Sequence, residues 1–132
     1  MNIQKIIINF IKYYLPVLLW LFLIFSLSSM KGNATHKNID IWFYIERKGA
    51  HIMEYFILTI LLLRLFSYEK VERIKAIIFA GGISLLWAFS DEVHQLFVFG
   101  REGKISDVGI DFIGIFLAIT LNLILVKYRR KI

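Results

Sequence analysis

The segment SDEVHQLFVFGREGKISDVGID, residues 90–111, lies between two strongly apolar runs and carries many ionisable side chains. Ionisable groups at the edge of a membrane are costly unless they are paired, hydrated or bound to a ligand, so by default they indicate a functional site. The segment therefore predicts the ends of two membrane helices, a polar connection between them and a site where they meet.

Four apolar runs extend through the chain, at residues 13–29, 51–66, 74–89 and 108–126. Each is near the minimum length that lets a helix cross about 30 Å of hydrocarbon. At 58% hydrophobic residues, a chain of 132 residues is too apolar for a soluble domain. We predict a single all-α membrane domain over residues 1–132, with four transmembrane helices at about 10–29, 41–66, 73–97 and 107–127.

The N-terminal run has the outline of a signal peptide, with small residues at Ser26 and Ser28 near a candidate cleavage site. We interpret it as a retained first helix, with Pro16 in its first turns, where the missing N–H matters least. Glycines at positions 81, 82, 109 and 114 predict close approach of neighbouring helices.

The positive charges predict an orientation and exclude one class of partner. Of sixteen Lys and Arg residues, ten lie at the termini or between the second and third runs, and six lie in the other two connections. By the positive-inside rule, both termini face the cytoplasm. These residues sit at the ends of apolar runs and form no aromatic-interleaved stripe, so we expect membrane lipids and no nucleic acid as partners.

Polar residues of three predicted helices fall at one depth, near the outer ends. Helical spacing places each set on one face of its helix. The sets are Arg47, His51, Glu54 and Tyr55 on the second helix, Trp87, Asp91, His94 and Gln95 on the third, and Asp107, Asp111 and Gly114 on the fourth. Arg101 comes from the connecting loop, between Gly100 and Gly103.

A resemblance to a known family rests on these same positions. The pattern consists of His51, Glu54 and Tyr55, then Asp91, Glu92, His94 and Gln95, then Gly100, Arg101, Asp107, Asp111 and Gly114. It resembles the VanZ-like family of bacterial membrane proteins over residues 22–121. The resemblance implies several membrane passes, a bacterial plasma membrane and a link to the cell envelope or to glycopeptide (teicoplanin) resistance. Phe99 stands where that family often has Pro.

Two kinds of chemistry fit this set of residues. Imidazoles with carboxylates ligate Zn²⁺ or Mn²⁺, and carboxylates alone suit Mg²⁺ or Ca²⁺. The candidate ligands for such a divalent metal are His51, Glu54, His94, Asp107 and Asp111. Without a metal, His94 or Glu54 would transfer a proton, Arg101 would hold a phosphate or carboxylate, and Asp91 would complete the site. The remaining candidate binding residues are Arg47, Tyr55, Glu92 and Gln95.

A purely structural interpretation stays open beside these. The pairs Arg47–Glu54, Arg101 with Asp107 or Asp111, and His51–Asp91 would then hold the helices together. The leading hypothesis is a protein that acts at the outer membrane face on a lipid-linked or peptidoglycan-related molecule. The alternative is a non-catalytic envelope interaction protein. A proton-coupled transporter is disfavoured, because the inner halves of the helices hold no acidic residues.

Overall fold

The computed structural model describes residues 3–31, 41–101 and 103–129, and their regular structure is entirely helical. The elements are α1 (Ile3–Asn9), the π-helical segment η1 (Phe10–Tyr14), α2 (Leu15–Ser28), α3 (Ile41–Tyr68), α4 (Arg73–Gln95) and α5 (Ile105–Arg129). Four stretches are long and apolar enough to cross a membrane: Ile3–Ser28, Ile45–Tyr68, Arg73–Gln95 and Ile105–Tyr128. The prediction of an all-α membrane bundle with four transmembrane helices is confirmed.

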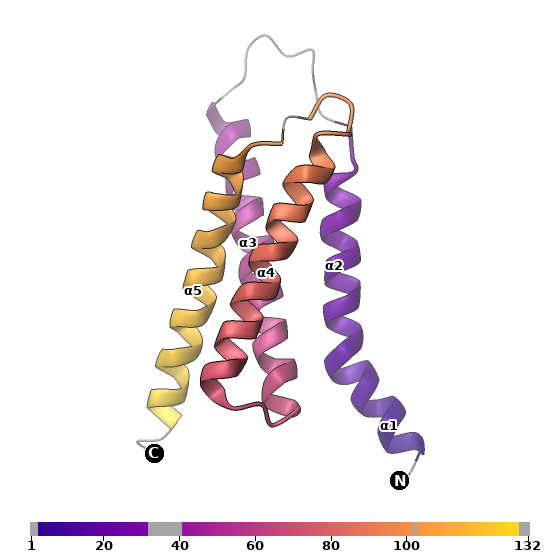
Figure 1. Cartoon of the computed structure of the whole chain (residues 1–132), viewed down its shortest axis with the longest axis vertical. Helices are drawn as coiled ribbons and strands as arrows, with labels where there is room; N and C mark the ends of the chain where they lie inside the picture. Colours follow the sequence, from indigo (N-terminus) through magenta and orange to yellow (C-terminus); the bar gives the residue numbers. More distant parts are fainter. Residues whose placement is uncertain (1–2, 32–40, 102, 130–132) are drawn as a thin grey trace.

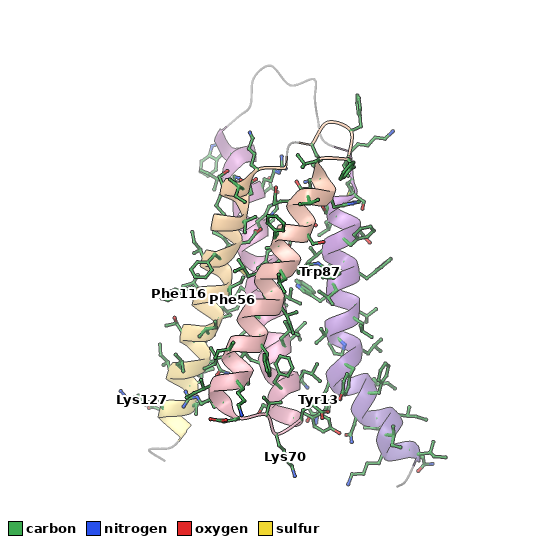
Figure 2. All side chains as sticks on the ribbon, in the orientation of Figure 1. Tyr13, Phe56, Lys70, Trp87, Phe116 and Lys127 are labelled. Atoms are coloured by element: carbon green, nitrogen blue, oxygen red, sulfur yellow. The ribbon has the colours of Figure 1, made fainter. Side chains whose placement is uncertain are left out.

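The helices run lengthwise through the bundle (Figure 1). One end of the bundle holds the start of α1, the last turn of α5 and the short α3–α4 turn. We call this the termini end. The opposite end, the loop end, holds the last turns of α2 and α4, the first turns of α3 and α5, and the connection from α4 to α5. The basic side chains of Lys70 and Lys127 lie at the termini end (Figure 2).

Helix α3 is central and packs most extensively against α5. The core of the bundle includes Tyr55 and Leu58 of α3, Ala88 of α4 and Ile115 of α5. Trp87 extends from α4 towards α2 and packs against this core (Figure 2). Aromatic, branched and small apolar side chains together thus fill the space between the helices.

Only some of the glycines serve close helix contact. A Cβ atom at Gly114 would overlap the backbone carbonyl of Ile52 on α3, and a Cβ at Gly81 would lie 3.4 Å from Ile119 Cδ1. No atom of the described residues lies within 4 Å of a Cβ built at Gly82 or Gly109, so the expectation of close contact there was wrong. Gly114 is therefore the glycine that sets the α3–α5 distance.

The N-terminal helix begins at Ile3 rather than near residue 10, so Pro16 lies well inside a continuous helical span. Pro16 lies in the first turn of α2, as predicted, but α2 continues directly from η1 and α1. A proline inside a helix cannot donate to the preceding turn and its ring crowds that turn. The π-helical segment η1, in which the Leu15 N–H donates to the Phe10 carbonyl, directly precedes Pro16 and changes the helical register there.

A wide belt of apolar side chains covers the outside of the bundle. Phe22, Leu86 and Phe116 are each more than half exposed. Such a surface is unusual for a soluble protein and suits contact with acyl chains. Inside the belt, the Thr59 hydroxyl donates to Ser84 Oγ at 2.9 Å and so links α3 to α4. The sequence analysis did not anticipate this buried polar contact.

Candidate functional site

Buried polar and charged residues gather at the loop end. Of the nine that the described residues contain, six lie in the loop-end turns of α3, α4 and α5. They are His51, Asp91, Glu92, Gln95, Asp107 and Asp111. We call these six residues, together with the half-buried Glu54, the polar cluster. Polar residues from three helices thus lie at one depth, as their spacing in the sequence predicted.

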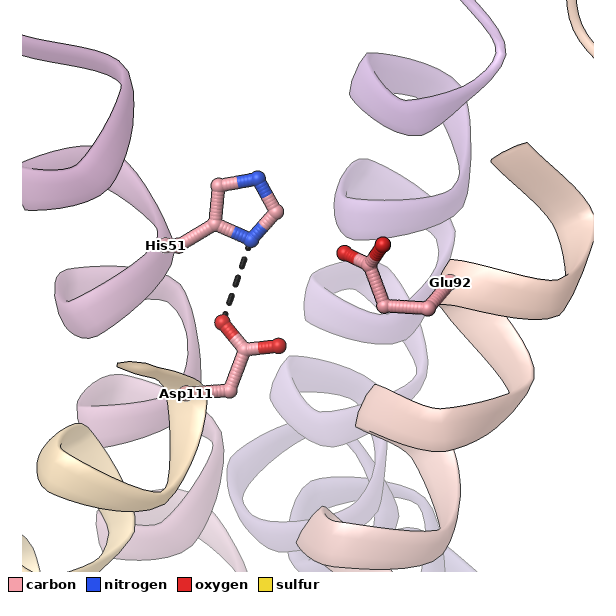
Figure 3. Close-up of side chains that lie close together, drawn as sticks. All are labelled: His51, Glu92 and Asp111. Atoms are coloured by element: carbon pink, nitrogen blue, oxygen red, sulfur yellow. Dashed lines mark hydrogen bonds and ion pairs between the residues drawn. The ribbon is translucent and has the colours of Figure 1, made fainter. Parts of the chain in front are cut away.

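His51 and Asp111 form the innermost contact of the polar cluster. The imidazole Nδ1 lies 3.1 Å from Asp111 Oδ1, and the Asp111 side chain is fully buried. Glu92 reaches towards the same space from α4 (Figure 3). One ligand atom from each of these three residues lies within 4.8 Å of the others. A nitrogen and two carboxylates from three helices thus share one small volume.

A buried glutamine orients two of the acids. The Gln95 amide nitrogen donates to Asp91 Oδ2 at 2.9 Å and lies 3.5 Å from Glu92 Oε1. Its carbonyl oxygen accepts from Arg47 Nη2 at 3.3 Å. The backbone N–H of Lys104 donates to the other oxygen of Glu92 at 2.8 Å. Contacts of this kind fix the direction of a carboxylate without neutralising it.

Asp107 is held separately from His51. Its carboxylate forms an ion pair with Lys48 of α3 and accepts from Ser106 Oγ at 3.2 Å. Asp107 also lies in the first turn of α5, where a negative charge is favoured by the helix dipole. Its local contacts therefore account for its burial.

Arg101 joins the loop to α2. Its Nε donates to the carbonyl of Met30 at 3.0 Å, and its Nη2 donates to that of Leu27 at 2.8 Å. These carbonyls belong to the end of a helix, where intrahelical donors are lacking. Partial burial, and then the nearby charge of Arg47, lower the pKa of the Arg101 guanidinium from its ordinary value.

The pairs expected under the structural interpretation were wrong. Arg47 donates to Gln95 rather than to Glu54, and His51 contacts Asp111 rather than Asp91. Arg101 donates to backbone carbonyls rather than to Asp107 or Asp111. The charged side chains do link helices, but through other partners than the expected ones.

His94 faces α2. Its Nε2 lies 3.0 Å from Ser29 Oγ, and its ring packs on Phe25 with centroids 4.6 Å apart. Of the five residues predicted as metal ligands, His51 and Asp111 are together and Glu54 lies near them, whereas His94 and Asp107 contact other groups. Glu92 takes the place beside His51. Its spacing of three residues from Gln95 puts both on one side of α4, but His94 has the same spacing from Asp91, so spacing alone did not single out Glu92.

Two further groups border this space. The Tyr55 side chain is completely buried, and no described group forms a hydrogen bond with its hydroxyl. Glu54 lies close enough to His51, Asp91 and Asp111 to interact with them electrostatically. The arrangement offers an excess of negative oxygens, which suits a cation or a ligand rich in hydrogen-bond donors.

The family model for VanZ/LLP1 matches residues 10–126, which covers most of the chain and the whole polar cluster. The chain belongs to the VanZ/LLP1 family. No curated protein and no solved structure matched it in the other two comparisons. The family resemblance inferred from the motif residues between positions 51 and 114 is thereby confirmed. Because four of its helices are long and apolar enough to cross a membrane, this VanZ/LLP1 protein is a multipass membrane protein.

The VanZ/LLP1 chain also has a small apolar pocket beside Glu92 of the polar cluster, between the end of α4 and the residues at the start of α5. It holds about 240 Å³ and is lined by Phe89, Glu92, Val93, Leu96, Gly103 and Ile105. The volume is below that of a typical small-molecule site, so it suits a segment of a hydrocarbon chain rather than a whole ligand. Glu92 thus borders both the polar cluster and an apolar surface.

Proposed function

We propose that this VanZ/LLP1 protein lies in the bacterial plasma membrane and binds the polar head group of a lipid-linked cell-envelope molecule at its loop end. In doing so it contributes to glycopeptide (teicoplanin) resistance. One observation carries the proposal: six buried polar or charged residues from three helices converge at one end of an otherwise apolar bundle. Burying so many acids is costly unless something binds them.

The surroundings of the polar cluster support a ligand with a hydrocarbon chain. The apolar pocket beside Glu92 would receive the first part of such a chain, and the exposed apolar belt would contact the rest. A molecule anchored in the bilayer reaches this site by lateral diffusion, without leaving the membrane. This favours a lipid-linked substrate over a soluble one.

The distribution of basic residues supports an outward-facing loop end. Ten of the sixteen Lys and Arg residues belong to the termini end by sequence position, and positive residues favour the cytoplasmic side. The polar cluster would then open towards the cell envelope. Peptidoglycan precursors and large glycopeptides are found on that side.

The donors and acceptors define the head group that would fit. Glu54 and Asp91 offer carboxylate oxygens to hydroxyl, amide or ammonium donors of a sugar or peptide. Arg101, at the rim of the polar cluster, supplies the positive charge that a phosphate linkage needs. Glu54 is also the group that would accept a proton in a reaction, because its side chain lies beside His51 and is not fully buried.

We expect the substitution Asp91→Asn to abolish the effect of the protein on teicoplanin susceptibility. The amide keeps the shape and one acceptor oxygen for Gln95 but removes the charge. The measurement is the minimal inhibitory concentration of teicoplanin in a susceptible host that expresses the chain, with membrane abundance determined by immunoblot. The variant should return to the value of the empty vector at unchanged abundance.

Glu72→Gln is the matched control, because Glu72 is an exposed acid at the termini end whose ion pair with Lys75 is solvated. It should behave as the wild-type chain does. If Asp91→Asn retained full effect, or if resistance simply followed the amount of protein in the membrane, the polar cluster would have a structural role only.

A further inference from the structure

We propose that His51, Glu92 and Asp111 form a binding site for one divalent transition-metal ion, Zn²⁺ or Mn²⁺. All three side chains are buried, and one ligand atom from each lies within 4.8 Å of the others. An imidazole nitrogen with two carboxylates is a common ligand set for both ions. The three ligands come from α3, α4 and α5, so the ion would join three helices.

An unsatisfied oxygen supports the site independently of the cluster itself. Asp111 is completely buried, and no described group donates a hydrogen bond to its Oδ2. In Figure 3 this second oxygen of Asp111 lies on the side of the carboxylate that faces Glu92. An isolated buried carboxylate oxygen is costly, and a metal ion bound between the two acids would remove that cost.

The charged side chains around the site also favour a bound cation. Glu54, Asp91, Glu92 and Asp111 lie close enough together to act on the same Tyr55 hydroxyl electrostatically. Two nearby positive side chains make their direct contacts with other groups, Lys48 with Asp107 and Arg47 with Gln95. Arg101 lies near Glu54, Asp91 and Glu92, but its hydrogen bonds go to carbonyls at the end of α2, so among the described side chains four acids face one remaining positive charge. A divalent cation would offset the repulsion among these acids.

The distances allow coordination with small adjustments. Ligand atoms bonded to Zn²⁺ at about 2.0–2.2 Å lie roughly 3–3.5 Å apart, and His51 Nδ1 and Asp111 Oδ1 are already 3.1 Å apart. Bidentate coordination by the Asp111 carboxylate would use its unpaired Oδ2 as well. Coordination requires the neutral imidazole with Nδ1 deprotonated. Glu92 would approach by side-chain rotation, and the Lys104 N–H and Gln95 already orient its carboxylate.

The nitrogen ligand decides the class of ion. Mg²⁺ and Ca²⁺ prefer oxygen ligands alone, whereas imidazole suits Zn²⁺ and Mn²⁺. We therefore expect affinity to decrease from Zn²⁺ to Mn²⁺ to Mg²⁺. The inference stands apart from head-group binding, because ion uptake is measured without any lipid substrate.

The test is metal titration of the full-length chain, purified in detergent, treated with chelator and then desalted. Isothermal titration calorimetry with ZnCl₂ and with MnCl₂, and elemental analysis after gel filtration, measure affinity and stoichiometry. One equivalent of Zn²⁺ per chain is expected. The substitutions His51→Gln, Glu92→Gln and Asp111→Asn should each weaken Zn²⁺ binding by more than about tenfold. Substituting a residue that only supports a metal ligand already costs about that much, so loss of a ligand should cost at least as much.

His94→Gln is the matched control, because it removes an imidazole two residues from Glu92 that contacts Ser29 and Phe25 instead, and it should bind Zn²⁺ as the wild-type chain does. Thermal unfolding of each chelator-treated variant shows whether it is folded. If His51→Gln or Asp111→Asn prevents folding, the Zn²⁺ affinity of Glu92→Gln tests the site instead. Absence of Zn²⁺ and Mn²⁺ uptake by the wild-type chain would overturn the site, and so would equal affinity in the ligand variants.

Discussion

Gly114→Ala is expected to destabilise the bundle strongly. The added Cβ would overlap the Ile52 carbonyl and approach the backbone nitrogen of Phe56, both on α3. Overpacking typically costs about 1–3 kcal/mol, and backbone atoms yield less readily than a side chain, so we expect the upper part of that range or more. The gain of about 0.5–1 kcal/mol from replacing a helical glycine by alanine would offset only part of it. Thermal unfolding in detergent measures the effect.

Gly109→Ala provides the matched control on the same helix. In the part of the chain that the structure describes, nothing lies within 4 Å of a Cβ at that position, so the variant should be as stable as the wild-type chain or slightly more stable. Equal unfolding temperatures for the two variants would contradict the close α3–α5 contact.

Asp111→Leu is expected to cause the second large loss of stability. Removing one partner of a buried polar pair leaves the other uncompensated and costs about 3–5 kcal/mol. Here the stranded group is the His51 imidazole, which is itself buried. Asp111→Asn keeps an acceptor oxygen for His51 and should lose much less stability.

A double-mutant cycle makes this expectation specific. Combining Asp111→Leu with His51→Phe replaces both polar partners by apolar groups, a change that is often neutral. The double variant should therefore recover most of the stability that Asp111→Leu loses, as measured by thermal unfolding in detergent. If the double variant instead lost as much stability as the two single variants together, the two residues would not act as a pair.

Spacing in the sequence was enough to predict four apolar spans and a polar cluster at one end. Runs of about 17 or more apolar residues specify membrane helices, because the backbone must satisfy its own hydrogen bonds in hydrocarbon. A spacing of three or four residues specifies one helix face, which placed His51 with Tyr55 and Asp91 with Gln95. These features depend only on local geometry.

The partners of each side chain could not be predicted in the same way. Successive residues in a helix are rotated by about 100°, so Glu92 and His94 lie on opposite sides of Asp91. Which of them faces His51 depends on how α4 is rotated between α2 and α5. That rotation is set by contacts distant in the sequence, such as those of Ala80 and Ala88 in the core. Spacing within one helix does not contain this information.

The start of the first helix was missed for a different reason. Pro16 was taken as a residue of the first turns because prolines are favoured there. The π-helical segment η1 lets the helix extend back to Ile3 without the usual conflict at proline. A change of register of this kind is not visible in an apolar sequence pattern.

Apart from the pairs that join helices, His51 with Asp111 and Lys48 with Asp107, we expect the acids of the polar cluster to serve a ligand rather than the stability of the bundle. The most direct measurement is the thermal unfolding midpoint of Glu54→Gln in detergent. Glu54 is attracted by His51 and Arg101 and repelled by Asp91 and Asp111, and its burial disfavours a charge, so removing that charge should leave the midpoint nearly unchanged, as is common for binding-site residues. A fall as large as that of Asp111→Leu would contradict the account.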